Sequence, residues 1–142
     1  MIRYLADTNI LGYLARHTSP RLRVRMRAAM EAHEVAISVV TRAETRFGQR
    51  LLNPDDRRQS AIDALLQEIP TLMWTPDAAD RYGDLAAVLQ RKGRPIGTMD
   101  TMIAAHALAE GLILVTHNTK DFKRVPGLEI EDWAGAAVTP GS

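Results

Sequence analysis

The sequence predicts an α/β fold, a three-layer α/β/α sandwich around a five-stranded parallel sheet. Apolar runs of strand length alternate with helical patterns from the first residues to about residue 131. Most of these short runs are apolar on both faces, which is typical of buried parallel strands. Successive runs are joined by stretches with helical character, as parallel strands require.

Length and composition indicate one domain. The chain has 142 residues, 46% hydrophobic and 25% charged, with a formal net charge of +1. We expect one domain over residues 1–135 and a short flexible tail over 136–142. The near-zero charge excludes a global basic field, so attraction to nucleic acid must come from local patches. The absence of cysteine excludes disulfides, thiolate catalysis and zinc–sulfur sites. Without a signal-peptide pattern or an apolar run of about 20 residues, we expect a cytoplasmic protein that does not enter membranes.

In the first half of the chain, capping residues and apolar spacing set the expected boundaries. Ser19-Pro20 matches an N-cap followed by proline at the first helical position. Residues 21–27 alternate with a period of two, but Ala28 to Ala32 continue as good helix formers, so a helix is preferred there. Thr41 and Glu44 match a capping box. The expected elements are a strand over 2–6, helices over 8–16 and 20–31, a strand over 35–40, and helices over 42–52 and 53–69.

The second half continues the alternation. Thr75-Pro76 begins a helix and Gly111 ends another. Trp133 is expected to cover one end of the core. The expected elements are a strand over 71–74, a helix from 76 to about 92, a helix over 99–110, a strand over 112–115, a polar loop with one helical turn over 116–122, and an edge strand over 128–131.

Four acids stand at related places in this scheme. Asp7 ends the first strand, Glu44 lies in the first turn of the helix after the second, and Asp121 follows the fourth by six residues. Ligands of open parallel sheets bind beyond the carboxyl ends of the strands, so these three acids are expected at that edge. Asp100, in the first turn of the helix before the fourth strand, joins them only if its long loop returns over the sheet.

Converging carboxylates repel one another, which raises their pKa values or opens the site unless a divalent cation offsets the repulsion. Two carboxylates about 5 Å apart repel by roughly 3 kcal/mol at an effective dielectric near 20. Oxygen ligands without histidine or cysteine at metal spacing favour Mg²⁺ or Mn²⁺ over zinc. A water bound to such an ion can be activated for attack on phosphorus.

Each acid also has a plain structural interpretation, and the sequence leaves these open. Asp7 can cap the following helix, because Asp, Thr and Asn are all good N-cap residues. Glu44 can be the acid of a capping box, Asp100 an ordinary acid of a first turn, and Asp121 an acid of a surface loop.

Four stretches follow one another in order along the chain: Leu5-Ala6-Asp7-Thr8-Asn9, Ser38-Val39-Val40-Thr41-Arg42-Ala43-Glu44, Pro95-Ile96-Gly97 with Asp100 through Ala107, and Val115 through Phe122. Together they resemble the PIN-domain ribonucleases. The ending Val125-Pro126-Gly127-Leu128 through Trp133 is similar to VapC-type toxins of bacterial toxin–antitoxin pairs. The resemblance covers nearly the whole chain. It implies a five-stranded parallel sheet and a Mg²⁺- or Mn²⁺-dependent endoribonuclease that hydrolyses RNA, with transfer RNA the usual substrate class.

The resemblance also assigns roles by position. Asp7, Glu44 and Asp100 match the core catalytic acids and Asp121 the more variable fourth acid, with Asp7 and Asp100 as direct metal ligands. Asn9, Thr116 and Asn118 match polar positions that support the site. It further implies a homodimer inhibited by a small VapB-like antitoxin whose tail fills the acidic groove.

Basic residues and histidines complete the candidate set. Arg42, Arg46 and Lys120 are candidate contacts for RNA phosphates, with a solvated helix face or partner contacts as the alternative. His106 is interpreted as a packing residue and His117 as a polar loop residue.

Three other functions share parts of this pattern. A phosphoryl-receiving signalling domain needs an acidic pair at the first strand and an Asp ending the third, where Met73-Trp74-Thr75 stands. A haloacid-dehalogenase-type phosphatase needs an acid at Asn9. A non-catalytic RNA-binding or scaffold domain, stabilised by its metal, is not excluded by the sequence.

Overall fold

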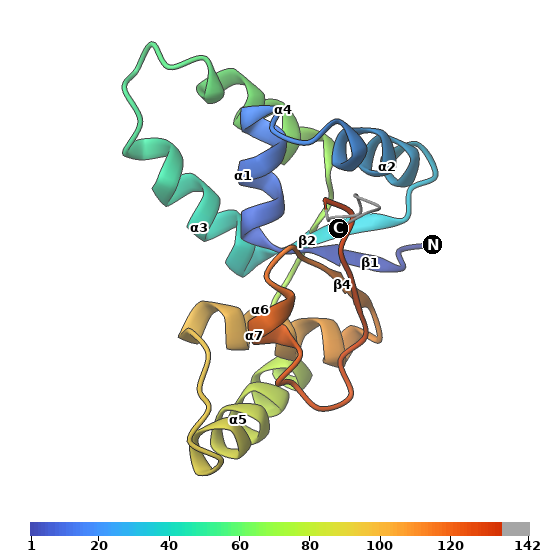
Figure 1. Ribbon diagram of the computed structural model, residues 1–142, viewed down its shortest axis with the longest axis vertical. Coiled ribbons are helices and arrows are strands. Elements are labelled where there is room, and N and C mark those ends of the chain that lie inside the picture. The colour runs from blue at the N-terminus through green and yellow to red at the C-terminus, as the bar shows by residue number, and fades with distance from the viewer. Residues whose placement is uncertain (135–142) are drawn as a thin grey trace, which may run out of the picture.

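The computed structural model describes residues 1–134, so the expected tail over 136–142 and the end of the expected domain at 135 lie outside the described residues. Five parallel strands form one sheet in the order β3-β2-β1-β4-β5 (Figure 1). They are β1 Tyr4–Ala6, β2 Val35–Ser38, β3 Thr71–Leu72, β4 Ile113–Val115 and β5 Ile130–Glu131. This confirms the predicted fold class and strand number.

Seven helices connect or follow these strands in the described residues. They are α1 Thr8–Arg16, α2 Pro20–Glu31, α3 Val39–Arg50, α4 Arg58–Glu68, α5 Pro76–Arg91, α6 Thr98–Glu110 and α7 Thr119–Phe122. No helix among residues 1–134 is both long enough and apolar enough to cross a bilayer.

Alternate residues of the strands face two separate cores. Tyr4 and Ala6 pack with α1, α2 and α4 on one side of the sheet, whereas Leu5 packs with α5, α6 and α7 on the other. Figure 1 shows these two helical layers on opposite sides of the strands. Burial on both faces explains why the strands are apolar throughout.

The predicted helix over 20–31 is confirmed as α2, with the Ser19 hydroxyl accepting a hydrogen bond from the Leu22 N–H. Helical capping therefore outweighs the period-two pattern of its arginines. Trp133 is buried and packs edge-on against Tyr4, so it covers one end of the core as expected.

Two predicted boundaries between residues 38 and 42 are wrong. The strand expected over 35–40 ends at Ser38, and α3 begins at Val39 rather than near 42. Ser38, and not Thr41, is the N-cap, because its hydroxyl accepts the Val40 N–H at 3.0 Å. The apolar pair at 39–40 resembles strand sequence, but Val40 buries against the sheet from the first turn of a helix.

The helix expected to begin near residue 53 begins at Arg58. The Asp56 N–H donates to the Asn53 carbonyl, and the Asp56 carboxylate accepts the Arg58 N–H at 2.9 Å. These bonds form turns that compete with the helix, which is what Asn and Asp side chains commonly do. Two strands are shorter than expected. The strand expected over 71–74 ends at Leu72 as β3, and the strand expected over 128–131 begins at Ile130 as β5.

Candidate active site

Asp7 is at the carboxyl edge of the central strand. Ala6 is in register with Ile37 of β2 and Val115 of β4, so the residues that follow these three strands meet at one level. Asp7 is only 1% exposed. It accepts the Ile10 N–H at 3.0 Å on Oδ1 and the Thr116 hydroxyl at 2.5 Å on Oδ2. Asp7 therefore caps α1, as the plain interpretation held, while both its oxygens are fixed at the sheet edge.

The surroundings of Asp7 favour its protonated form. Its pKa rises from 3.8 to about 6, chiefly through burial and further through the charges of Asp100 and Glu44. The hydrogen bonds from Thr116 and Ile10 act in the opposite direction. Burial disfavours a bare charge, so ionised Asp7 calls for a positive partner.

Glu44 reaches the site from α3. Its Oε1 accepts the Thr8 hydroxyl at 2.5 Å, across from the first turn of α1. Because α3 begins at Val39, Glu44 lies in the second turn, so it is not the acid of a capping box and lies beyond the turn where the helix dipole acts most strongly. Thr8 was not among the predicted site residues, although it directly follows Asp7 in the sequence.

Asp100 lies in the first turn of α6, as predicted. Its pKa is raised by burial first and then by the charges of Glu44 and Asp121. These effects require the start of α6 to lie close to the carboxyl edge of the sheet. The loop before α6 therefore makes the return on which the predicted convergence depended.

Asp121 lies on the short helix α7 and is held by its neighbours. Its Oδ2 accepts the Asn118 side-chain amide at 3.1 Å, and Arg124 lies 3.6 Å from Oδ1. The Asn118 N–H in turn donates to the Thr116 hydroxyl, which donates to Asp7. A chain of hydrogen bonds thus links two of the acids through the predicted supporting residues.

The four acids act on one another, but they do not form a closed metal cage. The charges of Asp100 and Glu44 raise the pKa of Asp7, and the charges of Glu44 and Asp121 raise the pKa of Asp100. Among residues 1–134, no group of three or more histidine, aspartate or glutamate side chains is close enough to hold an ion. This donor set suits Mg²⁺, which commonly takes one or two carboxylates and keeps several waters. Asn9 is exposed, and it lines a surface hollow that Glu44 also lines.

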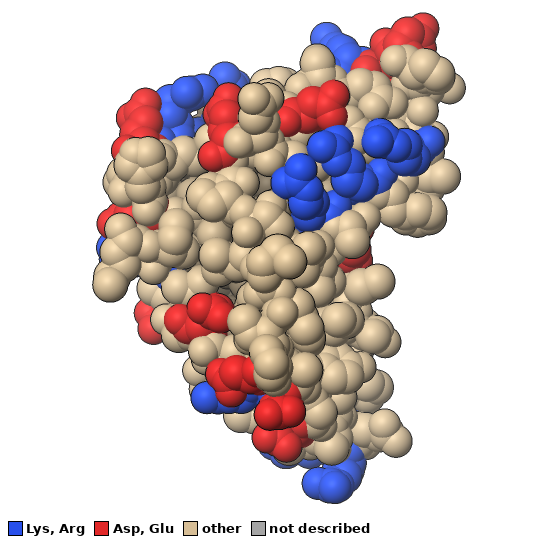
Figure 2. Space-filling view, turned by 180° about the vertical axis from the view of Figure 1, so that it is seen from behind, with Lys and Arg blue, Asp and Glu red and all other residues tan. Residues whose placement is uncertain are grey.

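The predicted RNA contacts divide into two kinds. Arg42 donates to the Leu66 carbonyl at 3.2 Å and the Thr71 hydroxyl at 3.0 Å, and Arg46 pairs with Asp63 at 2.7 Å, so both hold α3 to its neighbours. Figure 2 shows a row of basic side chains over α3. Lys120 on α7 is exposed.

Both histidines are placed as interpreted. His106 is fully buried, with its Nδ1 2.7 Å from the Ser38 hydroxyl and its ring edge-on to Trp74. His117 is exposed, and its Nδ1 lies 3.0 Å from the Asp132 carboxylate. The contact of His106 with the cap of α3 has no local signal, because 68 residues separate the partners.

The sequence of this chain is similar to those of known nucleases. A family model for the PIN domain matches residues 4–128. The tRNA(fMet)-specific endonuclease VapC of Shigella flexneri is 36% identical over 134 residues, covering 94% of this chain and 100% of that protein. Ribonuclease VapC2 of Haemophilus influenzae is 35% identical, covering 94% and 99%.

A solved structure agrees with the fold as well. DNA-bound VapBC from Salmonella typhimurium superposes with a TM-score of 0.86 at 32% identity, covering 94% of this chain and 99% of that one. Nucleases of the PIN family generally depend on a metal ion. The sequence and the sheet of this chain match those relatives. The chain therefore belongs to the PIN-domain family and, within it, to the VapC ribonucleases.

Proposed function

We propose that this chain is a Mg²⁺- or Mn²⁺-dependent endoribonuclease and the toxin of a toxin–antitoxin pair, hydrolysing phosphodiester bonds of transfer RNA in the cytoplasm. The observation that supports it most is the buried Asp7 carboxylate, opposed by the charges of Glu44 and Asp100 and therefore in need of a cation. Relatives from Shigella flexneri and Salmonella typhimurium are named for cleavage of tRNA(fMet), which favours transfer RNA as the substrate class.

The residues divide the work of hydrolysis. Asp7 and Asp100 would hold the ion, which when bound supplies Lewis acidity and an activated water. The Thr116 hydroxyl and the Ile10 N–H fix the Asp7 oxygens and favour their ionised form. Thr8 holds one oxygen of Glu44, which leaves the other to accept a hydrogen bond from the attacking water.

The test is cleavage of purified transfer RNA with Mg²⁺, with EDTA, and by the Asp7→Asn variant. We expect cleavage only by the unaltered protein with the ion, and mapping of the cleaved ends would identify the RNA and the bond. Equal cleavage in all three reactions would refute the metal-dependent mechanism. Binding of RNA without any cleavage would instead favour the non-catalytic alternative.

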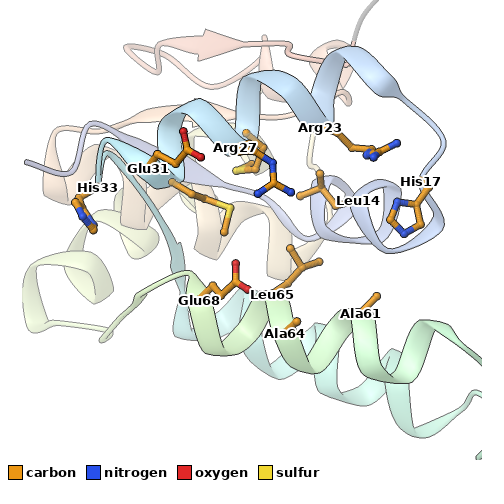
Figure 3. Close-up of a pocket in the computed structure, with 12 residues that line it drawn as sticks. Leu14, His17, Arg23, Arg27, Glu31, His33, Ala61, Ala64, Leu65 and Glu68 are labelled. Atoms are coloured by element: carbon orange, nitrogen blue, oxygen red, sulfur yellow. The ribbon is translucent and has the colours of Figure 1, made fainter.

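A second hollow supports a protein partner, the antitoxin. This hollow of about 440 Å³ lies between α2 and α4. Figure 3 shows Leu14 and Leu65 facing it. Charged side chains of both signs also line it, namely Arg23, Arg27, Glu31 and Glu68. Three relatives of known structure are VapBC complexes. We propose that an apolar helix of a VapB-like antitoxin, with acidic residues opposite these arginines, occupies this hollow in a complex built on a homodimer of this chain.

Variant Leu65→Glu tests the antitoxin site. A buried charge in an apolar interface is costly, so inhibition by the co-expressed antitoxin should be lost while cleavage of RNA is kept. Retained inhibition would exclude this hollow as the binding site. Light scattering of the purified chain, alone and with the antitoxin, tests the homodimer.

A further inference from the structure

Two glycines occupy matching places on the neighbouring helices α1 and α3. Thr8 and Glu44 are joined by a hydrogen bond, and each is followed four residues later by a glycine, Gly12 on α1 and Gly48 on α3. Residues four apart lie on the same helix face, one turn further along. The two helices lie side by side in Figure 1. One turn beyond the acidic edge, both therefore present bare backbone.

A hollow lies beside this glycine pair. Its volume is about 240 Å³, and Thr8, Glu44, Gly12, Gly48 and Arg16 are among the residues that line it. The hollow is thus continuous with the acidic site at one end.

Gly48 is not required by the packing of this chain. A Cβ built there would meet no atom within 4 Å, and glycine in a helix interior is less favourable than alanine by about 1 kcal/mol. Gly83 on α5 also has open space around it, so open space alone indicates no function. Gly48 differs because it borders a hollow that begins at a proposed catalytic acid, where a bare backbone allows close approach of a ligand.

Arg16 brings a positive charge to the hollow. A Cβ built on Gly12 would lie 3.4 Å from one terminal nitrogen of the Arg16 guanidinium and 3.7 Å from the other, so this side chain folds back along α1 toward the acidic site. The guanidinium also lies over the Tyr13 ring, 5.3 Å from its centroid. In the described part of the chain, Arg16 forms no salt bridge with a carboxylate.

We propose that the hollow between Gly12 and Gly48 is a subsite for the nucleotide next to the cleaved phosphodiester bond of single-stranded RNA, and that Arg16 binds its phosphate. The proposal rests on the nuclease function proposed above. A phosphate near four acids requires a cation, and a guanidinium offers two parallel donors to phosphate oxygens. A single strand can turn one unstacked nucleotide into a narrow slot, whereas the bases of a duplex remain stacked.

The test compares Gly48→Leu with Gly83→Leu. Both glycines are exposed, lie inside helices and have no atom within 4 Å of a built Cβ, so both variants should fold. A helical leucine points back toward the preceding turn, so at position 48 it fills the hollow. Binding of a labelled single-stranded oligoribonucleotide in EDTA should weaken about ten-fold or more with Gly48→Leu and stay unchanged with Gly83→Leu. Binding of Mn²⁺, followed by calorimetry, should be the same in both.

Arg16→Gln tests the phosphate contact, with Arg91→Gln on α5 as its control. The variant should weaken RNA binding and lower its salt dependence by about one phosphate contact. If Gly48→Leu and Arg16→Gln bind and cleave RNA as well as their controls, the subsite is refuted. It is also refuted if Gly48→Leu loses only inhibition by the antitoxin, because the hollow then holds a protein segment. A chain that cleaves no RNA, yet binds it more weakly after Gly48→Leu, would show that the hollow binds RNA and would refute both the nuclease and a subsite beside a cleaved bond.

Discussion

Replacing Asp7 by asparagine should stabilise the metal-free protein at pH 8. A rise in the pKa of Asp7 from 3.8 to about 6 means that its ionised form costs roughly 3 kcal/mol of folding free energy. Asparagine removes that charge and can still accept the Ile10 N–H. With its oxygen accepting that N–H, its NH2 group cannot accept the Thr116 hydroxyl, and the loss costs about 1 kcal/mol. The net gain is therefore about 2 kcal/mol, or about 6 °C in melting temperature.

The advantage should reverse in acid. Between pH 3.8 and about 6 the folded protein binds a proton that the unfolded chain releases, so the free energy of unfolding falls as the pH rises through this range. Below pH 3.8 Asp7 is neutral in both states, and Asp7→Asn should then be less stable than the unaltered protein by about 1 kcal/mol.

The assay is urea unfolding in EDTA at pH 8 and at pH 3.5, followed by circular dichroism. Asp84→Asn, at an exposed acid on α5, is the matched control and should change stability little at either pH. If Asp7→Asn is less stable than the unaltered protein at both pH values, burial does not oppose ionisation of Asp7, and the main support for a cation at this edge is lost.

Three further outcomes are expected. In a thermal-shift assay, Mg²⁺ should raise the melting temperature at pH 7.5 and far less at pH 5, where protonated Asp7 cannot bind the ion. An equal rise at both pH values would contradict a role for Asp7 in binding Mg²⁺. Thr116→Val should lower the free energy of unfolding in urea by about 1–3 kcal/mol, because it leaves the Asn118 N–H without its acceptor. It should also move the pH profile of cleavage upward, because loss of the hydroxyl raises the pKa of Asp7 further. An unchanged profile would contradict a role of Thr116 in setting that pKa. Arg42→Ala should destabilise by about 1–3 kcal/mol, since its guanidinium holds a backbone carbonyl and a hydroxyl, whereas Lys120→Ala should weaken RNA binding alone, and the opposite pattern would exchange their roles.

Much of the fold follows from local sequence. The apolar runs at 35–38 and 113–115 are short and bounded, so their strand character and order are clear from the chain itself. The place of Asp7 is equally local, because an acid that directly follows a buried strand must lie at its carboxyl end.

The start of α3 was not predictable in this way. Val39 and Val40 continue an apolar, β-branched run, and only the Ser38 cap and the buried site of Val40 make them helical. The same error placed Glu44 one turn too early. Its partner Thr8 lies 36 residues away, and no local pattern reports a contact at that separation.

The sequence by itself determined the parallel α/β fold, the family and the identity of the four acids. The tertiary structure decided that Asp100 meets the other three, because only the packing of α6 across the sheet brings its first turn back to the strand ends. It also decided how each carboxylate is held, since those hydrogen bonds join residues of different elements. Pairing across such distances depends on how whole elements pack, which the spacing of residues along one element cannot encode.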